Sequence, residues 1–312
     1  MKKYIFLLLL FILTFSCIYS QVIEGVSKAG KIYILQSNEN PQKYFAKNIQ
    51  RWAVVIGISQ YKYSNKGINP LRYADKDAKA FYDFLKTPNG GAFPESNIKL
   101  LLNKDATLSN INEAINVFLA KAIEEDIVII YFAGHGSPDP NNAKNLFLLT
   151  YDTDPNKMAA TGYLMDDLKK AMERFIKARN ILIFTDACHS AGVTGGYTTR
   201  ARSDELIVNR YLLNLARSEN STLIFTASEA NEKSLESTKW GGGHGVFTWA
   251  LLEGMKGEAD FNNDGIVTLG ELIDYTQEKV KRETNSQQHP DKSSTKFDRN
   301  LPMSVLRSEL WR

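Results

Sequence analysis

The chain contains very little cysteine. Its 312 residues include two, and one of them, Cys17, lies in an N-terminal segment that we expect to be removed. Cys188 would then be the single thiol, so the sequence excludes an internal disulfide. A zinc site is not favoured either, because one cysteine and four scattered histidines do not form a ligand cluster.

Neither sign of charge is in large excess. The chain has 38 Lys and Arg against 35 Asp and Glu, a formal net charge of +3. This small and evenly mixed charge argues against a nucleic-acid partner. An apolar fraction of 43% and a charged fraction of 23% are those of an ordinary globular protein.

A hydrophobic run long enough to span a membrane is also missing. The apolar stretch 4–13 follows two lysines and is too short to cross a bilayer. With the small and polar residues behind it, the segment 1–20 is typical of an export signal. We expect a secreted or periplasmic protein that begins at Gln21. The alternative is a lipoprotein anchored through Cys17, although the residues before Cys17 lack the usual leucine.

Short apolar, β-branched runs alternate with helical patterns along most of the chain. Runs of this kind are typical of strands buried on both faces, and their alternation with helices predicts an α/β fold. We expect a mostly parallel β-sheet flanked by helices on both faces, an α/β/α sandwich. The predicted strands are Trp52–Ile58, Ile98–Leu102, Ile127–Phe132, Ile181–Thr185 and Leu223–Thr226. The predicted amphipathic helices are Ala74–Leu85, Ser109–Ile123, Tyr163–Ile176 and Gly245–Met255.

The sequence predicts one large domain at 51–300 that consists of two parts. A polar connection joins the parts, and we expect this connection to be functional or mobile. The expected segments are the signal 1–20, a lead-in at 21–50 with one strand at Lys31–Leu35, a first part at 51–192, the connection at 193–220, a second part at 221–300 and a tail at 301–312.

Two of the predicted strands end in reactive residues. One runs to His135 and Gly136, and the other runs to Asp186 and Cys188. The carboxyl ends of neighbouring parallel strands lie at the sheet edge where ligands bind. His135 and Cys188 can therefore come together there, although they are 53 positions apart (188 minus 135). A cysteine is a good nucleophile as the thiolate, which a nearby imidazole favours. That imidazole can also protonate a leaving amine, and an amide beside a glycine can bind an oxyanion. The alternative is that Cys188 is a small buried hydrophobe and Gly-His-Gly a turn.

The two motifs resemble those of the caspase-like cysteine peptidases, most closely the metacaspase branch. That branch has Tyr-x-Gly-His-Gly followed by Asp-x-Cys-His-Ser-Gly, and a histidine about 50 residues before the cysteine is a caspase trait. Further similarity lies in Trp52-Ala-Val-Val-Ile-Gly-Ile, Asp75, Asp77-Ala78 and Phe225-Thr-Ala-Ser228. One departure is Ala191, where the family commonly has glycine directly after Cys-His-Ser.

The resemblance implies a cysteine endopeptidase that hydrolyses peptide bonds through a thioester and needs no cofactor for catalysis. Its partners would be protein or peptide substrates, and we expect a monomer. The implied roles are His135 as general base and acid, Cys188 as nucleophile, the amides of Gly136 and Cys188 as oxyanion hole, and Asp77 and Asp186 as the acidic lining of a pocket for Arg or Lys. The alternative is a non-catalytic signalling or interaction module on the same fold. Of the other histidines, we interpret His189 as support for the turn at the nucleophile, His244 as a loop residue and His289 as a surface residue.

The second part of the chain matches the formula of an EF-hand calcium loop at residues 260–271. Hard cations take oxygens at alternating positions, with a glycine for the sharp turn and a distal glutamate. The predicted Ca²⁺ ligands are Asp260, Asn262, Asp264, the carbonyl of Ile266, Thr268 and Glu271. The alternative is that the loop is an Asp-Gly turn in which Thr268 and Glu271 form a capping box for the following helix.

The polar connection also offers sites for self-cleavage. Arg200 and Arg202 lie in a stretch, 197–204, without a convincing helical pattern, so its backbone is expected to be open to a protease. Arg210 and Arg217 fall in a possible helix at 205–216 and are disfavoured, because a helix must open before it can be cut. The alternative is that these arginines form a solvated loop face.

Overall fold

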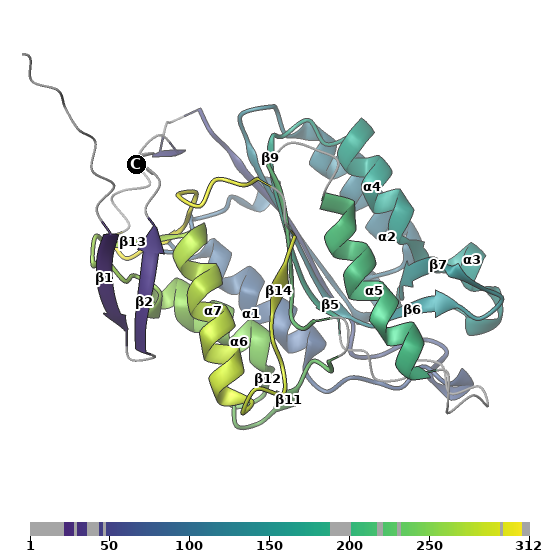
Figure 1. Ribbon diagram of the computed structural model, residues 1–312. Helices are drawn as coiled ribbons and strands as arrows, with labels where there is room; N and C mark the ends of the chain where they lie inside the picture. Colours follow the sequence, from purple (N-terminus) through teal and green to yellow (C-terminus); the bar gives the residue numbers. More distant parts are fainter. Residues whose placement is uncertain are drawn as a thin grey trace, which may run out of the picture.

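A six-stranded sheet forms the centre of the molecule (Figure 1). The computed structural model describes residues 22–27, 30–35, 44–45, 48–187, 201–216, 221–229, 232–293 and 296–307, with the backbone alone in the first two ranges and in 201–207. The strands lie in the order β14, β10, β9, β5, β3, β4. All neighbours are parallel except β14, which is antiparallel to β10. The bounds are β3 Arg51–Gly57, β4 Ile98–Leu102, β5 Ile127–Gly134, β9 Asn180–Ala187, β10 Thr222–Thr226 and β14 Asp291–Lys292.

Successive side chains of the central strands are buried in two different cores. In β3, Val54 and Ile56 belong to one core, whereas Ala53 and Val55 belong to the other. This follows from the alternation of side chains along a strand, and it requires apolar residues at every position. Continuous apolar runs therefore become the middle strands of the sheet.

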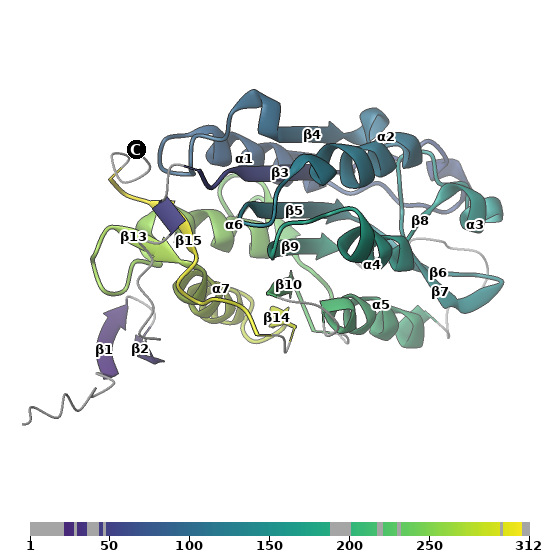
Figure 2. The ribbon, with the colours of Figure 1, turned by 90° about the horizontal axis from the view of Figure 1, so that it is seen from above.

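Helices cover both faces of the sheet (Figure 2). One core contains side chains of α1, α6 and α7, and the other contains side chains of α2, α4 and α5. The bounds on the first face are α1 Ala74–Lys86, α6 Val246–Glu253 and α7 Leu269–Glu283. Those on the second face are α2 Leu108–Glu113, α4 Met165–Arg174 and α5 Ala201–Leu215. The predicted α/β class, with a mostly parallel sheet between two layers of helices, is confirmed.

Smaller elements lie around the sheet, and most of them had no clear pattern in the sequence. They are the hairpin β1 Val22–Ser27 and β2 Gly30–Leu35, the three-stranded sheet β6 Gly136–Asp139, β7 Asn142–Leu148 and β8 Tyr163–Leu164, the short helix α3 Met158–Thr161, the pair β11 Glu236–Ser237 and β12 His244–Gly245, and the pair β13 Ile266–Thr268 and β15 Pro302–Val305.

Three predicted elements differ from those observed. The predicted helix 109–123 is α2 followed by a π-helical turn and a 3₁₀ turn. The predicted helix 163–176 begins as strand β8, because Tyr163 and Leu164 pair with β7 before α4 starts. The expectation that 197–204 lacks a helix is wrong from residue 201 onward, since α5 begins at Ala201. Arg202 is therefore helical, whereas Arg200 lies outside the described residues.

The export signal and its alternative fall on residues that lie outside the described ranges. Within those ranges, none of the helices combines the length and the apolar character that crossing a membrane requires.

Candidate active site

The ends of β5 and β9 bring the two predicted motifs together. The strands are paired in parallel, with Ala133 opposite Asp186 and Gly134 opposite Ala187. His135 follows Gly134 directly, and Cys188 is the residue after Ala187. Cys188 and His189 lie outside the described residues, so the predicted roles of Cys188 as nucleophile and oxyanion donor and of His189 as turn support remain predictions.

His135 is fully buried and held by contacts on two sides. Its ring stacks on Tyr61, with the ring centroids 5.2 Å apart, and its backbone N–H donates to the Tyr61 hydroxyl at 2.9 Å. Its Nε2 lies 2.7 Å from the backbone carbonyl oxygen of Asn69. A carbonyl oxygen can only accept, so Nε2 must carry the hydrogen. Nδ1 is then the nitrogen that can take a proton in the neutral ring.

The Gly136 amide also has a defined direction. Gly136 lies opposite Leu148 in the β6–β7 ladder, and the N–H of Leu149 donates to the carbonyl of His135 at 2.9 Å. In an antiparallel pair this bond makes Gly136 and Leu148 a non-hydrogen-bonded pair. The N–H of Gly136 therefore points away from β7, which leaves it outside the ladder, as an oxyanion donor must be.

Asp77 and Asp186 form a buried acidic pair. Asp77 lies in the first turn of α1 and Asp186 in β9. Gly245 lies between them, because a Cβ on this residue would come 2.6 Å from Oδ2 of Asp186 and 3.1 Å from Oδ2 of Asp77. The structure therefore brings together the two carboxylates that the resemblance assigned to one pocket.

Each carboxylate has its own hydrogen-bond donors. Asp186 accepts from the hydroxyls of Ser234 at 2.6 Å and Thr248 at 2.8 Å. Asp77 accepts from the N–H of Gly245 at 3.0 Å, and its Oδ1 lies 2.6 Å from Nδ1 of His244. These donors lower the cost of burying the two groups.

Burial nevertheless dominates the titration of this pair. It raises the pKa of Asp77 to about 7, and the negative charge of Asp186 adds to the increase, while His244 and Gly245 oppose it. Burial also raises the pKa of Asp186, against the hydrogen bonds from Ser234 and Thr248. Like charges close together in a buried site disfavour double ionisation. A cationic side chain would be a favourable partner here.

Several residues of this site were missed by the sequence analysis. The interpretation of His244 as a loop residue is wrong, since it lies in β12 and contacts Asp77. Ser234 and Thr248 stand 48 and 62 positions from Asp186, and nothing in the local sequence connects them to it. His289, interpreted as a surface residue, is partly exposed, with Nδ1 2.5 Å from Oε1 of Glu232.

Comparison with known proteins agrees with this geometry. Residues 50–302 match the family model of the caspase domain. The chain belongs to the caspase-domain family. Its resemblance to caspase-like peptidases is thereby confirmed at the level of the family.

Two relatives of this caspase domain can be named. A protein described as a probable protease, from a Desulfuromonadales bacterium, is 28% identical over 261 residues, which are 75% of this chain and 30% of the relative. The chain thus matches less than a third of that relative's length. The crystal structure of a Geobacter sulfurreducens protein matches with a TM-score of 0.56 and 19% identity, over 83% of this chain and 100% of that one. At this identity the second likeness concerns the fold alone.

The predicted calcium loop of the caspase domain is a compact turn between the end of α6 and α7. Asp260 accepts from the N–H groups of Asp264 at 3.2 Å and Gly265 at 3.0 Å, and Gly265 has a left-handed φ of 86°. Glu271 accepts from the N–H and hydroxyl of Thr268 and so forms a capping box at the start of α7. Within the described part of the chain, no three His, Cys, Asp or Glu side chains are arranged to hold a metal ion.

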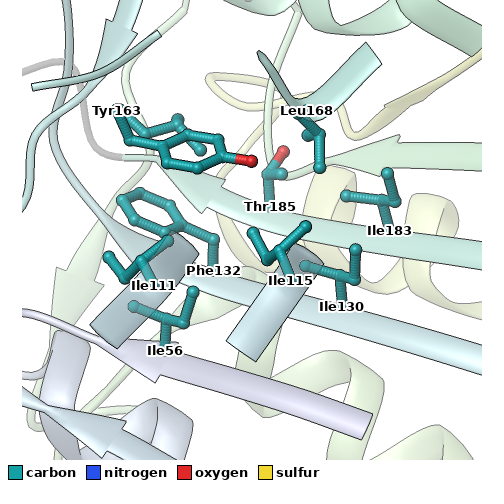
Figure 3. Close-up of a pocket in the computed structure, with 10 residues that line it drawn as sticks. Ile56, Ile111, Ile115, Ile130, Phe132, Tyr163, Leu168, Ile183 and Thr185 are labelled. Atoms are coloured by element: carbon teal, nitrogen blue, oxygen red, sulfur yellow. The ribbon is translucent and has the colours of Figure 1, made fainter. Parts of the chain in front are cut away.

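The caspase domain also contains an internal cavity on the other face of the sheet (Figure 3). It lies between β3, β5 and β9 on one side and α2, the π-helical turn after it and α4 on the other. Two hydroxyls point into it, those of Tyr163 and Thr185, and both are buried without a hydrogen-bond partner among the described residues. The remaining lining is apolar: Ile56, Ile111, Ile115, Ile130, Phe132, Leu148, Leu168 and Ile183. This cavity lacks the polar groups that a peptidase site needs.

Proposed function

We propose that this caspase-domain protein is a cysteine endopeptidase in which His135 and Cys188 are the catalytic pair. The observation that carries the proposal is the contact between Nε2 of His135 and the carbonyl of Asn69. It leaves Nδ1 as the proton-accepting nitrogen of a residue that directly follows Gly134, and Gly134 is paired with Ala187, the residue before Cys188. The carbonyl also stabilises the imidazolium that forms during the reaction.

The proposed reaction needs one proton relay. Cys188 gives its proton to Nδ1 of His135, and the thiolate attacks the scissile carbonyl carbon. The N–H of Gly136, together with that of Cys188, donates to the oxyanion. The imidazolium then protonates the leaving amine as the C–N bond breaks, which leaves a thioester. Water attacks the thioester and gives a proton to Nδ1, the carboxylic acid leaves, and the proton returns to the sulfur.

The proposed specificity is for Arg or Lys on the amino side of the cleaved bond. Asp77 and Asp186 are buried, close together and without a Lys or Arg partner among the described residues. A guanidinium or ammonium group can enter as the missing counter-charge, whereas a substrate aspartate would be repelled.

Fluorogenic peptides that differ only in Arg, Lys or Asp at the cleavage site test the function. We expect cleavage after Arg and Lys, loss of activity in Cys188→Ala, and one-to-one inactivation by a thiol alkylator. Asp186→Asn should lower kcat/KM for the Arg peptide at least about 30-fold, because a buried charge pair that loses one partner costs about 2 kcal/mol or more. Efficient cleavage after Asp would contradict the specificity. A folded protein without any cleavage would favour the signalling module.

The proposal extends to calcium and to export. We propose that loop 260–271 binds Ca²⁺ as a structural or regulatory ion, supported by its alternating oxygen ligands and the turn at Gly265. We also propose that the chain is exported after loss of residues 1–20. Mass spectrometry of the native protein should then find Gln21 as the first residue, whereas a lipid on Cys17 would identify the alternative.

A further inference from the structure

His244 is the basic side chain that pairs with the acidic pocket. Its Nδ1 lies 2.6 Å from Oδ1 of Asp77, while the other carboxylate oxygen accepts from Gly245. The His244 side chain is 19% exposed and that of Asp77 is 4% exposed. His244 is therefore partly open to water, whereas the carboxylate it contacts faces the interior.

The charged groups around this pair come from β9, β11, α1 and the loop before α1. Asp186 faces Gly245 from β9, and its donors are the neutral hydroxyls of Ser234 and Thr248. Glu236 of β11 is half-buried, accepts from the N–H of Arg72, and has its pKa raised by burial, with a further contribution from Asp186. Arg72 interacts electrostatically with Glu236, and Lys76, which is in the same helix as Asp77, lies over the ring of Tyr73. The pocket thus gathers three carboxylates, one of which has a histidine partner.

We propose that His244 is a specificity-determining residue of this pocket, which holds the Asp77 carboxylate ionised and oriented so that a Lys or Arg side chain is accepted near neutral pH. The inference rests on the proposed function, in which Asp77 and Asp186 line the site for the basic side chain. His244 is a positioning residue, because it acts on the substrate through Asp77.

The physical reason is the instability of two adjacent buried charges. Burial and Asp186 both favour the protonated form of Asp77, and His244 is the largest influence in the opposite direction. A protonated Asp77 offers no charge to a guanidinium. The ionised fraction of Asp77 increases as pH rises through its pKa of about 7, so affinity for a basic side chain increases over the same range. Without His244 that increase moves to higher pH.

Binding to the Cys188→Ala protein tests this without catalysis. The probes are a tetrapeptide ending in arginine and the same peptide ending in citrulline, which has the same shape without the charge. Calorimetry from pH 5.5 to 9 gives Kd for each. We expect His244→Gln to weaken binding of the arginine peptide about fivefold at pH 7. The reason is that the fraction of protein molecules with an ionised Asp77 falls from about one half to about one tenth. Citrulline binding should not change.

A double-mutant cycle with Asp77→Asn separates this role from a structural one. In the Asp77→Asn background, His244→Gln should have no further effect on Kd. His289→Gln is the matched control, since it removes another histidine with a carboxylate neighbour, Glu232. It should leave the pH midpoint of arginine binding unshifted. Melting curves confirm that each variant is folded. In the active protein, His244→Gln should raise KM for the Arg substrate at pH 7 more than it lowers kcat.

Two results would overturn the inference in distinguishable ways. One result is that Asp77→Asn loses the preference for arginine over citrulline while His244→Gln keeps the pH profile of the parent. The proposed role of His244 is then wrong, and the assignment of Asp77 to the substrate pocket is retained. If Asp77→Asn keeps the preference, the assignment of the pocket in the proposed function is wrong as well.

Discussion

At His135, a backbone atom decides the chemistry of a side chain. The carbonyl of Asn69 sets which ring nitrogen carries the hydrogen, and the ring of Tyr61 holds the imidazole in place. The same scale governs Asp77 and Asp186, where burial raises the pKa of both carboxyl groups and their hydrogen-bond donors oppose the increase. Reactivity here depends on partners within a few ångströms of one atom.

Thr185 allows a prediction at the same scale. Its hydroxyl is buried in the apolar cavity and has no hydrogen-bond partner within the part of the chain that the structure describes, which costs about 1 to 3 kcal/mol. Valine has nearly the same shape and no hydroxyl, so Thr185→Val should increase the free energy of unfolding by about 1 kcal/mol. Urea unfolding measures the change.

Thr226→Val is the matched control on the neighbouring strand. The Thr226 hydroxyl is also buried, but it donates to the carbonyls of Ser228 and Asp291 at 3.1 Å each. Its removal should therefore destabilise the protein. An equal loss in both variants would mean that the Thr185 hydroxyl has a partner, such as an ordered water bridging it to Tyr163.

At the scale of elements, the loop before α7 serves two purposes. Glu271 is the third helical residue in the capping box of α7, whose N-cap is Thr268, and it is also the distal ligand of the proposed Ca²⁺ site. Burial raises its pKa to about 7, and the charges of Asp264 and Asp260 contribute. Because its ordinary value is 4.5, the unfolded chain ionises first, and the stability of the fold falls as pH rises from about 4.5 to 7.

Calcium should reverse this loss. At about ten times its Kd, Ca²⁺ should stabilise the fold by about 1.4 kcal/mol, and the effect should be larger at pH 8 than at pH 5.5, where protons compete for Glu271. Melting curves measure the shift. Glu271→Gln should retain the cap and abolish the calcium response, whereas Glu271→Ala should lose both. If calcium shifts the melting curve of Glu271→Gln as much as that of the parent, the proposal of a Ca²⁺ site at 260–271 is wrong.

At the scale of the whole molecule, the connection between the two parts of the chain determines where self-cleavage can occur. Arg202 lies in the first turn of α5, which packs on the sheet through Val208 and Leu212. A helix must open before it can enter an extended substrate groove, so the helical start disfavours a cut at Arg202. Arg200 precedes the helix in sequence.

Self-cleavage should therefore favour Arg200. Mass spectrometry of the purified parent should find fragments that end at Arg200, and these should be absent from Cys188→Ala. Arg200→Gln should remove most of the cleavage, while Arg202→Gln should remove little. A parent that is active on peptides and yet stays a single chain would end this proposal.

The strand and helix pattern was largely predictable because it is local. The runs within β3, β5, β9 and β10 are largely apolar, which is typical of strands covered on both faces. The same runs carry His135 and Asp186 to one edge of the sheet. Tyr163 shows the limit, because an apolar periodicity of three to four residues did not reveal that this residue pairs with β7.

Asp77 was assigned through the resemblance to metacaspases, whereas the amino-acid sequence alone was sufficient for the α/β class and for the place of His135 and Asp186. These follow from short-range patterns, since the apolar periodicity of a segment depends on which face of it is buried. The contacts that give those residues their chemistry came from the fold. Asn69, Ser234 and His244 lie 66, 48 and 167 positions from the side chains they contact. Such contacts depend on how loops and helices pack over the sheet. The spacing of residues within a local segment does not predict which distant residues will meet.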